Sequence, residues 1–68
     1  MLNGPLIKKL RQEKSLTQES LALRAEVSRP TVIKAERGEN IDLTSLGKLA
    51  LELGVNPGEL LEGNMKVE

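Results

Sequence analysis

The 68-residue sequence has no cysteine, no histidine and no aromatic residue. Without cysteine there is no disulfide framework, which is compatible with a reducing cytosol. Lacking both cysteine and histidine, the chain offers no familiar zinc ligands and no familiar nucleophile–base pair. We therefore expect that the protein has no enzymatic activity and binds no metal and no other cofactor.

Long apolar runs are also absent, since the longest extend over only two or three residues. A membrane span needs about 20 consecutive apolar residues, and a signal peptide needs an apolar stretch of about 7–15. The sequence therefore predicts no membrane segment and no membrane partner, and we expect a cytoplasmic location.

Net charge is zero, because ten basic residues balance ten acidic ones, but the charges are unevenly distributed. Residues 1–37 contain eight basic and four acidic residues, whereas residues 38–68 contain two basic and six acidic ones. A basic half suggests a polyanionic partner on that side. Taken alone, solvated surface charge explains the distribution equally well.

One helix-start signal recurs four times along the chain. In each case an apolar residue precedes a Thr, Ser, Asp or Asn cap and is followed five positions later by a second apolar residue, as in a hydrophobic staple. The caps are Thr17, Ser28, Asp42 and Asn56, and the apolar pairs are Leu16/Leu21, Val27/Val32, Ile41/Leu46 and Val55/Leu60.

A first helix is expected from Gly4-Pro5, and Gly38 and Gly54 are expected to follow the third and fourth helices. The predicted fold is all-α, with five short helices in residues 1–63 and a short tail at 64–68. An inward apolar stripe is predicted for the fourth helix, from Leu43, Leu46, Leu49, Ala50 and Leu53.

The second and third predicted helices, near residues 17–24 and 28–37, are separated only by residues 25–27. Helices joined so tightly cannot fold back on each other, which is typical of a helix-turn-helix. Its second helix can enter the major groove of DNA.

Residues 6–62 resemble the phage-repressor (Cro-type, XRE-like) helix-turn-helix family. The resemblance is carried by "LTQESLALRAEVSRPTVIKAERGEN" and "LTSLGKLALELGVNPGELL". It implies a lambda-repressor-like fold and a bacterial, archaeal or phage-encoded transcriptional regulator, expected to be a repressor. Its partner would be operator DNA, expected to be pseudo-palindromic and bound by a homodimer.

Residue roles follow from the same resemblance. Base contacts are implied for Ser28, Arg29, Pro30 and Lys34, and phosphate contacts for Thr17, Gln18, Thr31 and Arg37. Arg11 and Glu36 occupy positions that form a salt bridge in many relatives. Leu61, Met65 and Val67 are the candidates for a dimer contact.

Three departures from the family pattern stand out. Glu26 occupies a turn position where the family usually has glycine, because that residue tends to have a positive φ. Pro30 is expected to push Arg29 away from helical geometry, and its ring either packs on a thymine methyl or only stiffens the turn. Ala35 replaces a larger apolar residue.

Apolar residues at expected surface positions, Leu23, Ile33 and Leu51, leave a second interpretation open. The domain could be an antitoxin-type module whose main partner is a protein such as a toxin, and which also represses its own promoter.

Overall fold

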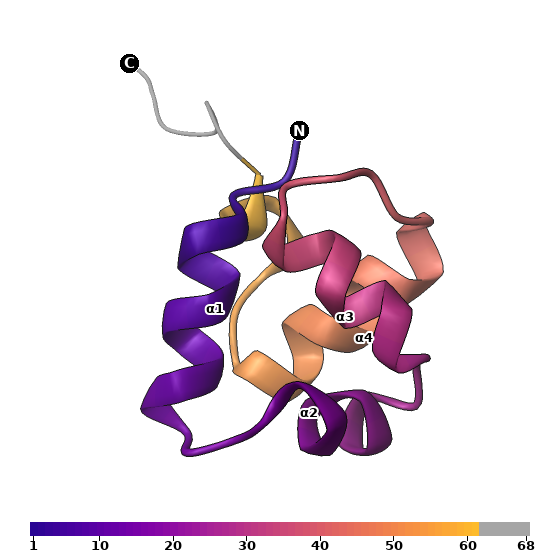
Figure 1. Cartoon of the computed structure of the whole chain (residues 1–68). Helices are drawn as coiled ribbons and strands as arrows, with labels where there is room; N and C mark the ends of the chain where they lie inside the picture. The colour runs from indigo at the N-terminus through magenta and orange to yellow at the C-terminus, as the bar shows by residue number, and fades with distance from the viewer. Residues whose placement is uncertain (62–68) are drawn as a thin grey trace.

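The computed structural model describes residues 1–61, and helices account for most of this part of the chain. They are α1 (Gly4–Glu13), α2 (Gln18–Ala25), α3 (Arg29–Glu36), α4 (Leu43–Leu53) and the 3-10 helix η1 (Pro57–Leu60). In Figure 1, α1 lies on the left, α2 crosses the bottom and α3 lies in front of α4. Packing joins α3 to both α1 and α2, and α4 to α2 and η1.

The all-α class is therefore confirmed for residues 1–61, but the prediction of a fifth α-helix is wrong. Residues Pro57–Leu60 form one 3-10 turn, in which Glu59 accepts a hydrogen bond from the Asn56 N–H, at 2.9 Å. The chain leaves the turn at once, because Leu61 is extended and pairs with Leu2 in an isolated antiparallel bridge. None of the described helices is long and apolar enough to cross a membrane.

The predicted helix starts are confirmed by their caps. The side chains of Thr17, Ser28 and Asp42 each accept a hydrogen bond from the N–H three residues later, at 3.0, 3.2 and 3.0 Å. Each bond satisfies one of the N–H groups that a helix leaves without an internal partner. Asn3 caps α1 in the same way, accepting from the Leu6 N–H at 3.1 Å.

Three tight turns share one three-residue pattern: a left-handed residue, an apolar residue and a cap. The apolar residue closes the preceding helix, because its N–H donates to a carbonyl five residues earlier, at 3.0–3.2 Å. The same residue then begins the staple of the next helix. The three linkers are Ser15-Leu16-Thr17, Glu26-Val27-Ser28 and Gly54-Val55-Asn56.

The core is aliphatic, as expected for a chain without aromatic residues. Its fully buried larger side chains are Ile7, Leu21, Val32, Leu49 and Leu60. The predicted stripe of α4 is wrong at one position, because Leu43 is 84% exposed. Leu43 is the first residue of α4, and the first core residue of this helix, Leu46, lies almost one turn further along.

Candidate nucleic-acid interface

Helix α3 has one buried side and one exposed side. Val32 and Ala35 are completely buried against the rest of the domain. Ala35 therefore does lie in the core, with a smaller side chain than the family pattern has. The exposed side carries Arg29, Pro30, Lys34 and the C-cap residue Arg37. This side combines charged donors with an apolar ring and makes α3 the candidate for contact with a ligand.

The link between α2 and α3 holds α3 in place. Leu21 and Val32 are fully buried and Val27 packs against the same core, so apolar contacts fill the space between the two helices. Glu26 adopts the left-handed conformation, with φ 60° and ψ 43°. The positive φ expected at this position is therefore present, with glutamate in place of glycine.

The first turn of α3 is tied together by two hydroxyl groups. Ser28 Oγ accepts from the Thr31 N–H and lies 2.8 Å from Thr31 Oγ1. One hydroxyl donates to the other, so the pair keeps one O–H donor without a partner within residues 1–61.

Arg29 is the first residue of α3, so the expected departure of Arg29 from helical geometry is wrong. Arg29 lies within the helical turn that is closed by the hydrogen bond from the Val32 N–H to the Ser28 carbonyl, at 3.3 Å.

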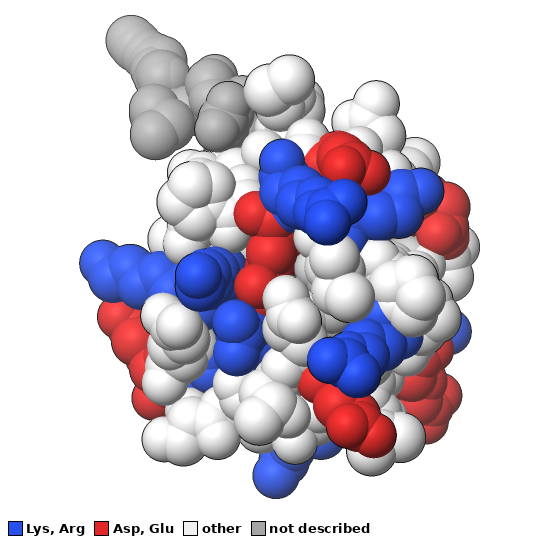
Figure 2. Space-filling view, in the orientation of Figure 1, with Lys and Arg blue, Asp and Glu red and all other residues white. Residues whose placement is uncertain are grey.

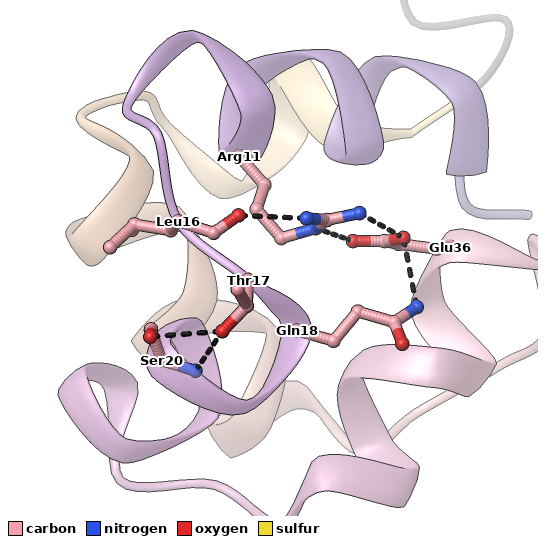
Figure 3. Close-up of polar contacts among 6 residues, drawn as sticks. All are labelled: Arg11, Leu16, Thr17, Gln18, Ser20 and Glu36. Atoms are coloured by element: carbon pink, nitrogen blue, oxygen red, sulfur yellow. Dashed lines mark hydrogen bonds and ion pairs between the residues drawn. The ribbon is translucent and has the colours of Figure 1, made fainter.

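A second hydroxyl pair lies at the start of α2 (Figure 3). Thr17 donates its hydroxyl to Ser20 Oγ at 2.9 Å, while its oxygen accepts the Ser20 N–H. The Thr17 donor is therefore occupied, and Ser20 holds the remaining O–H. Ser20 was not among the predicted DNA contacts. Its position three residues after the cap Thr17 is the sequence signal that could have identified it as the partner of Thr17.

Gln18, Arg11 and Glu36 form one polar network between three helices (Figure 3). Arg11 donates through Nε to Glu36 Oε2 and through Nη2 to Glu36 Oε1, so the implied salt bridge is present. The two side chains are only 10% and 6% exposed. Gln18 Nε2 also donates to Glu36 Oε1, at 3.2 Å. Its amide, predicted to contact phosphate, is thus held by α3.

Charge on this side of the molecule is mixed rather than uniformly basic. Figure 2 shows Lys and Arg over α1 and α3, with acidic side chains between them. Seven of the eight basic residues in positions 1–37 are exposed, Arg11 being the buried one. Arg37 lies 3.8 Å from Glu39, with 69% of its side chain exposed. On the face drawn in Figure 2, the basic side chains therefore alternate with acidic and uncharged ones.

The family follows from this geometry and from comparison with known proteins. Two short helices meet at a three-residue turn, and the second presents its outer side to solvent. The helix-turn-helix family model matches residues 7–60. The chain belongs to the helix-turn-helix family. The resemblance to phage-repressor-type (XRE-like) domains is thereby confirmed.

Several members of the helix-turn-helix family are similar over most of the chain. Control protein C.BamHI of Bacillus amyloliquefaciens is 34% identical over 64 residues, which cover 91% of this chain and 79% of that protein. The restriction-modification controller protein C.AhdI of Aeromonas hydrophila is 39% identical, with a TM-score of 0.75 over 85% of this chain and 89% of that chain. The P22 c2 repressor, crystallised with a synthetic operator, is 28% identical, with a TM-score of 0.81 over 93% and 97% of the two chains.

Apolar residues at the surface of this helix-turn-helix domain include leucines of α2 and α4 and one residue of α3. Leu23, Leu43 and Leu51 are 74%, 84% and 83% exposed, and Ile33 is half-buried. Among the predicted dimer contacts, Leu61 is 36% exposed and its backbone pairs with Leu2. Met65 and Val67, like the tail 64–68, lie outside the described residues.

Proposed function

We propose that this chain binds double-stranded DNA sequence-specifically, with α3 in the major groove, and acts as a transcriptional regulator. The observation that carries this proposal is the arrangement of α3, which buries Val32 and Ala35 and exposes Arg29, Pro30 and Lys34. A helix of this kind, set by a tight turn and exposed along one side, suits the major groove, which admits one α-helix.

Base contacts are assigned to the exposed side of α3. Arg29 offers a planar fork of N–H donors suited to guanine O6 and N7, and one such contact discriminates between bases by roughly 1–3 kcal/mol. Lys34 reaches a guanine or a phosphate one turn further along. Pro30 offers an apolar ring to a thymine methyl and Ser28 offers its hydroxyl to a base, whereas Thr31 lies nearer the DNA backbone and contacts a phosphate.

Phosphate contacts are assigned to both edges of the motif. Gln18, together with the Thr17–Ser20 hydroxyl pair, lies at the start of α2, where backbone N–H groups and the helix dipole favour an anion. Arg37 lies at the other end of α3. These contacts orient the domain on DNA without reading its sequence.

The regulator acts as a repressor and as a homodimer on a pseudo-palindromic operator, in the cytoplasm of a bacterium, an archaeon or a phage-infected cell, and catalyses no reaction. A single module of this size contacts few bases, so a second copy is needed for tight specific binding. P22 c2 repressor, a structural relative, is described in complex with an operator, which supports the same role here.

Fluorescence anisotropy tests this function. The full chain is titrated with a labelled duplex from the region upstream of its own gene and with a scrambled duplex of the same composition, near physiological salt and again at high salt. We expect a preference of about a thousandfold or more for its own DNA. Equal binding to both duplexes that weakens steeply with salt would indicate phosphate contact alone and contradict the proposal for this region.

A protein-binding role of the antitoxin type is the second candidate. It is favoured by Leu23 on α2 and by Leu43 and Leu51 on α4, which expose apolar side chains to solvent. Co-expression with the product of the adjacent gene tests it. A stable complex that is lost in Leu51→Glu but kept in Arg29→Ala would establish this role, whereas no complex with that product would leave DNA as the sole proposed partner.

A further inference from the structure

Gln18 begins α2, yet its side chain is held by the last residue of α3. Its Nε2 donates to Glu36 Oε1 at 3.2 Å, and the same oxygen accepts from Arg11 Nη2 at 3.2 Å. Arg11 also donates through Nη1 to the Leu16 carbonyl, at 2.7 Å, in the turn that precedes α2. One carboxylate therefore links α1, the start of α2 and the end of α3 (Figure 3).

The chemistry of this link determines which way the Gln18 amide faces. An ionised carboxylate only accepts hydrogen bonds, whereas an amide has an NH₂ donor end and a carbonyl acceptor end. Glu36 therefore holds the NH₂ end of Gln18 toward itself. Because Nε2 carries two hydrogens, one N–H remains for another acceptor, and it has no partner within residues 1–61.

Charge makes the same arrangement compatible with a nearby phosphate. An unpaired carboxylate beside the start of α2 would repel the DNA backbone. Arg11 neutralises Glu36 with two charge-assisted hydrogen bonds, and burial of both side chains keeps this ion pair away from solvent screening.

We propose that Arg11 and Glu36 are positioning residues for DNA binding, which act by holding the Gln18 amide so that its second N–H donates to a DNA phosphate. The inference rests on the proposed function. Neither Arg11 nor Glu36 touches DNA in this arrangement. Without the pair, Gln18 samples several rotamers and must be ordered when DNA binds, which weakens binding.

A double-mutant cycle tests this coupling. Arg11→Met together with Glu36→Met removes both charges at once, so that no unpaired charge is left buried and the domain still folds. This paired variant, Gln18→Ala, the combined variant and the wild type are titrated with the upstream duplex at a temperature where circular dichroism shows all four to be folded. We expect Gln18→Ala and the paired variant each to weaken binding by about 3- to 10-fold. In the Gln18→Ala background, the paired change should then cost less than twofold.

The salt dependence of binding distinguishes positioning by Arg11 from direct contact between Arg11 and a phosphate. Each phosphate neutralised by a cation contributes about 0.9 to the slope of log K against log salt concentration, and a neutral glutamine contributes nothing. We expect the wild type and the paired variant to have the same slope. A slope reduced by about 0.9 would mean that Arg11 itself contacts a phosphate, which would overturn the inference.

Additive losses of binding affinity in the double-mutant cycle, or no loss of affinity in Gln18→Ala, would also overturn the inference. A wild type without preference for the upstream duplex would instead contradict the proposed function for this DNA region. In that case the hydrogen bond from Gln18 to Glu36 can still be detected in the free protein, from the NMR signals of the Gln18 side-chain NH₂. One of these two protons should be shifted downfield, and the shift should vanish in the paired variant. An unshifted signal in the wild type would remove the basis of the positioning role.

Discussion

Glu26 and Gly54 occupy the same backbone position in two different turns. Each follows its helix in the left-handed conformation, with φ values of 60° and 78°, and each is followed by a valine and a cap. Glycine adopts this conformation without steric cost, whereas a residue with a Cβ is strained by about 1–2 kcal/mol. The turn that sets α3 is therefore the more strained of the two.

Replacing Glu26 with glycine should stabilise the domain by about 1 kcal/mol. For a domain of this size, the melting temperature should rise by roughly 4–8 °C, which a thermal unfolding scan measures. Glu26→Ala is the matched control, because it removes the carboxylate but keeps the strained Cβ. A lower melting temperature in Glu26→Gly would contradict the assignment of strain to this residue.

Gly4→Ala should destabilise the fold through a steric clash. A Cβ at position 4 would lie 2.2 Å from the Glu36 carbonyl oxygen and 2.8 Å from the Gly38 nitrogen. Relieving this overlap moves α1 away from the end of α3, at a cost of about 1–3 kcal/mol or more. Gly47→Ala is the control, because a Cβ there meets nothing within 4 Å. It should stabilise α4 by about 1 kcal/mol. Urea unfolding of both variants measures the change in the free energy of unfolding, which should be negative for Gly4→Ala and positive for Gly47→Ala. Changes of equal sign and size would contradict this prediction.

The buried ion pair should dominate the charge contributions to stability. Arg11→Ala leaves Glu36 buried with Gln18 as its remaining donor, and should lower the free energy of unfolding by about 3–5 kcal/mol. Arg24→Ala breaks the exposed pair with Glu52, whose atoms are 3.7 Å apart, and should cost less than about 1 kcal/mol. Chemical denaturation compares the two variants. Similar losses would mean that burial of the Arg11 pair has no energetic consequence.

Asp42 should titrate at a lower pH than an ordinary aspartate. The Ser45 hydroxyl and the Ser45 N–H both donate to its carboxylate, at 2.7 and 3.0 Å, and lower its pKa. Because the folded pKa is depressed, the stabilisation is fully present above the unfolded pKa of about 3.9. It is lost as the pH falls through the folded value.

Carboxyl-carbon NMR titration tests this assignment. Ser45→Ala should move the Asp42 midpoint upward, because the hydroxyl bond is the largest cause of the lowered pKa. Thr44→Ala, at an exposed neighbour, should leave the midpoint unchanged. An unmoved midpoint in Ser45→Ala would contradict the role of that bond.

Helix starts could be predicted from the sequence because they depend on residues close together in the chain. A cap and its staple lie within six positions, so Thr17, Ser28 and Asp42 were identified without tertiary information. The strained position Ser15, with φ 57°, was missed. Its residue type carries no turn signal as strong as that of glycine.

Features that depend on distant segments could not be predicted in the same way. Pairing of Leu2 with Leu61, the extended residue that follows η1, joins the two ends of the described chain. Exposure of Leu43 depends on where the neighbours of α4 end, which helical periodicity does not contain. The hydrogen bond from Gln18 to Glu36 joins residues 18 positions apart, so the family pattern predicted a role for Gln18 but not its anchor.

Sequence reading by α3 is tested most directly by a pair of arginine substitutions. Arg29 lies on the exposed side of α3, whereas Arg24 lies near the end of α2 and pairs with α4. Binding of Arg29→Ala and Arg24→Ala to the upstream duplex and to the scrambled duplex is measured by anisotropy. We predict that Arg29→Ala loses about 1–3 kcal/mol of discrimination between the two duplexes and that Arg24→Ala keeps it. Equal discrimination in both variants would contradict a base-reading role for α3.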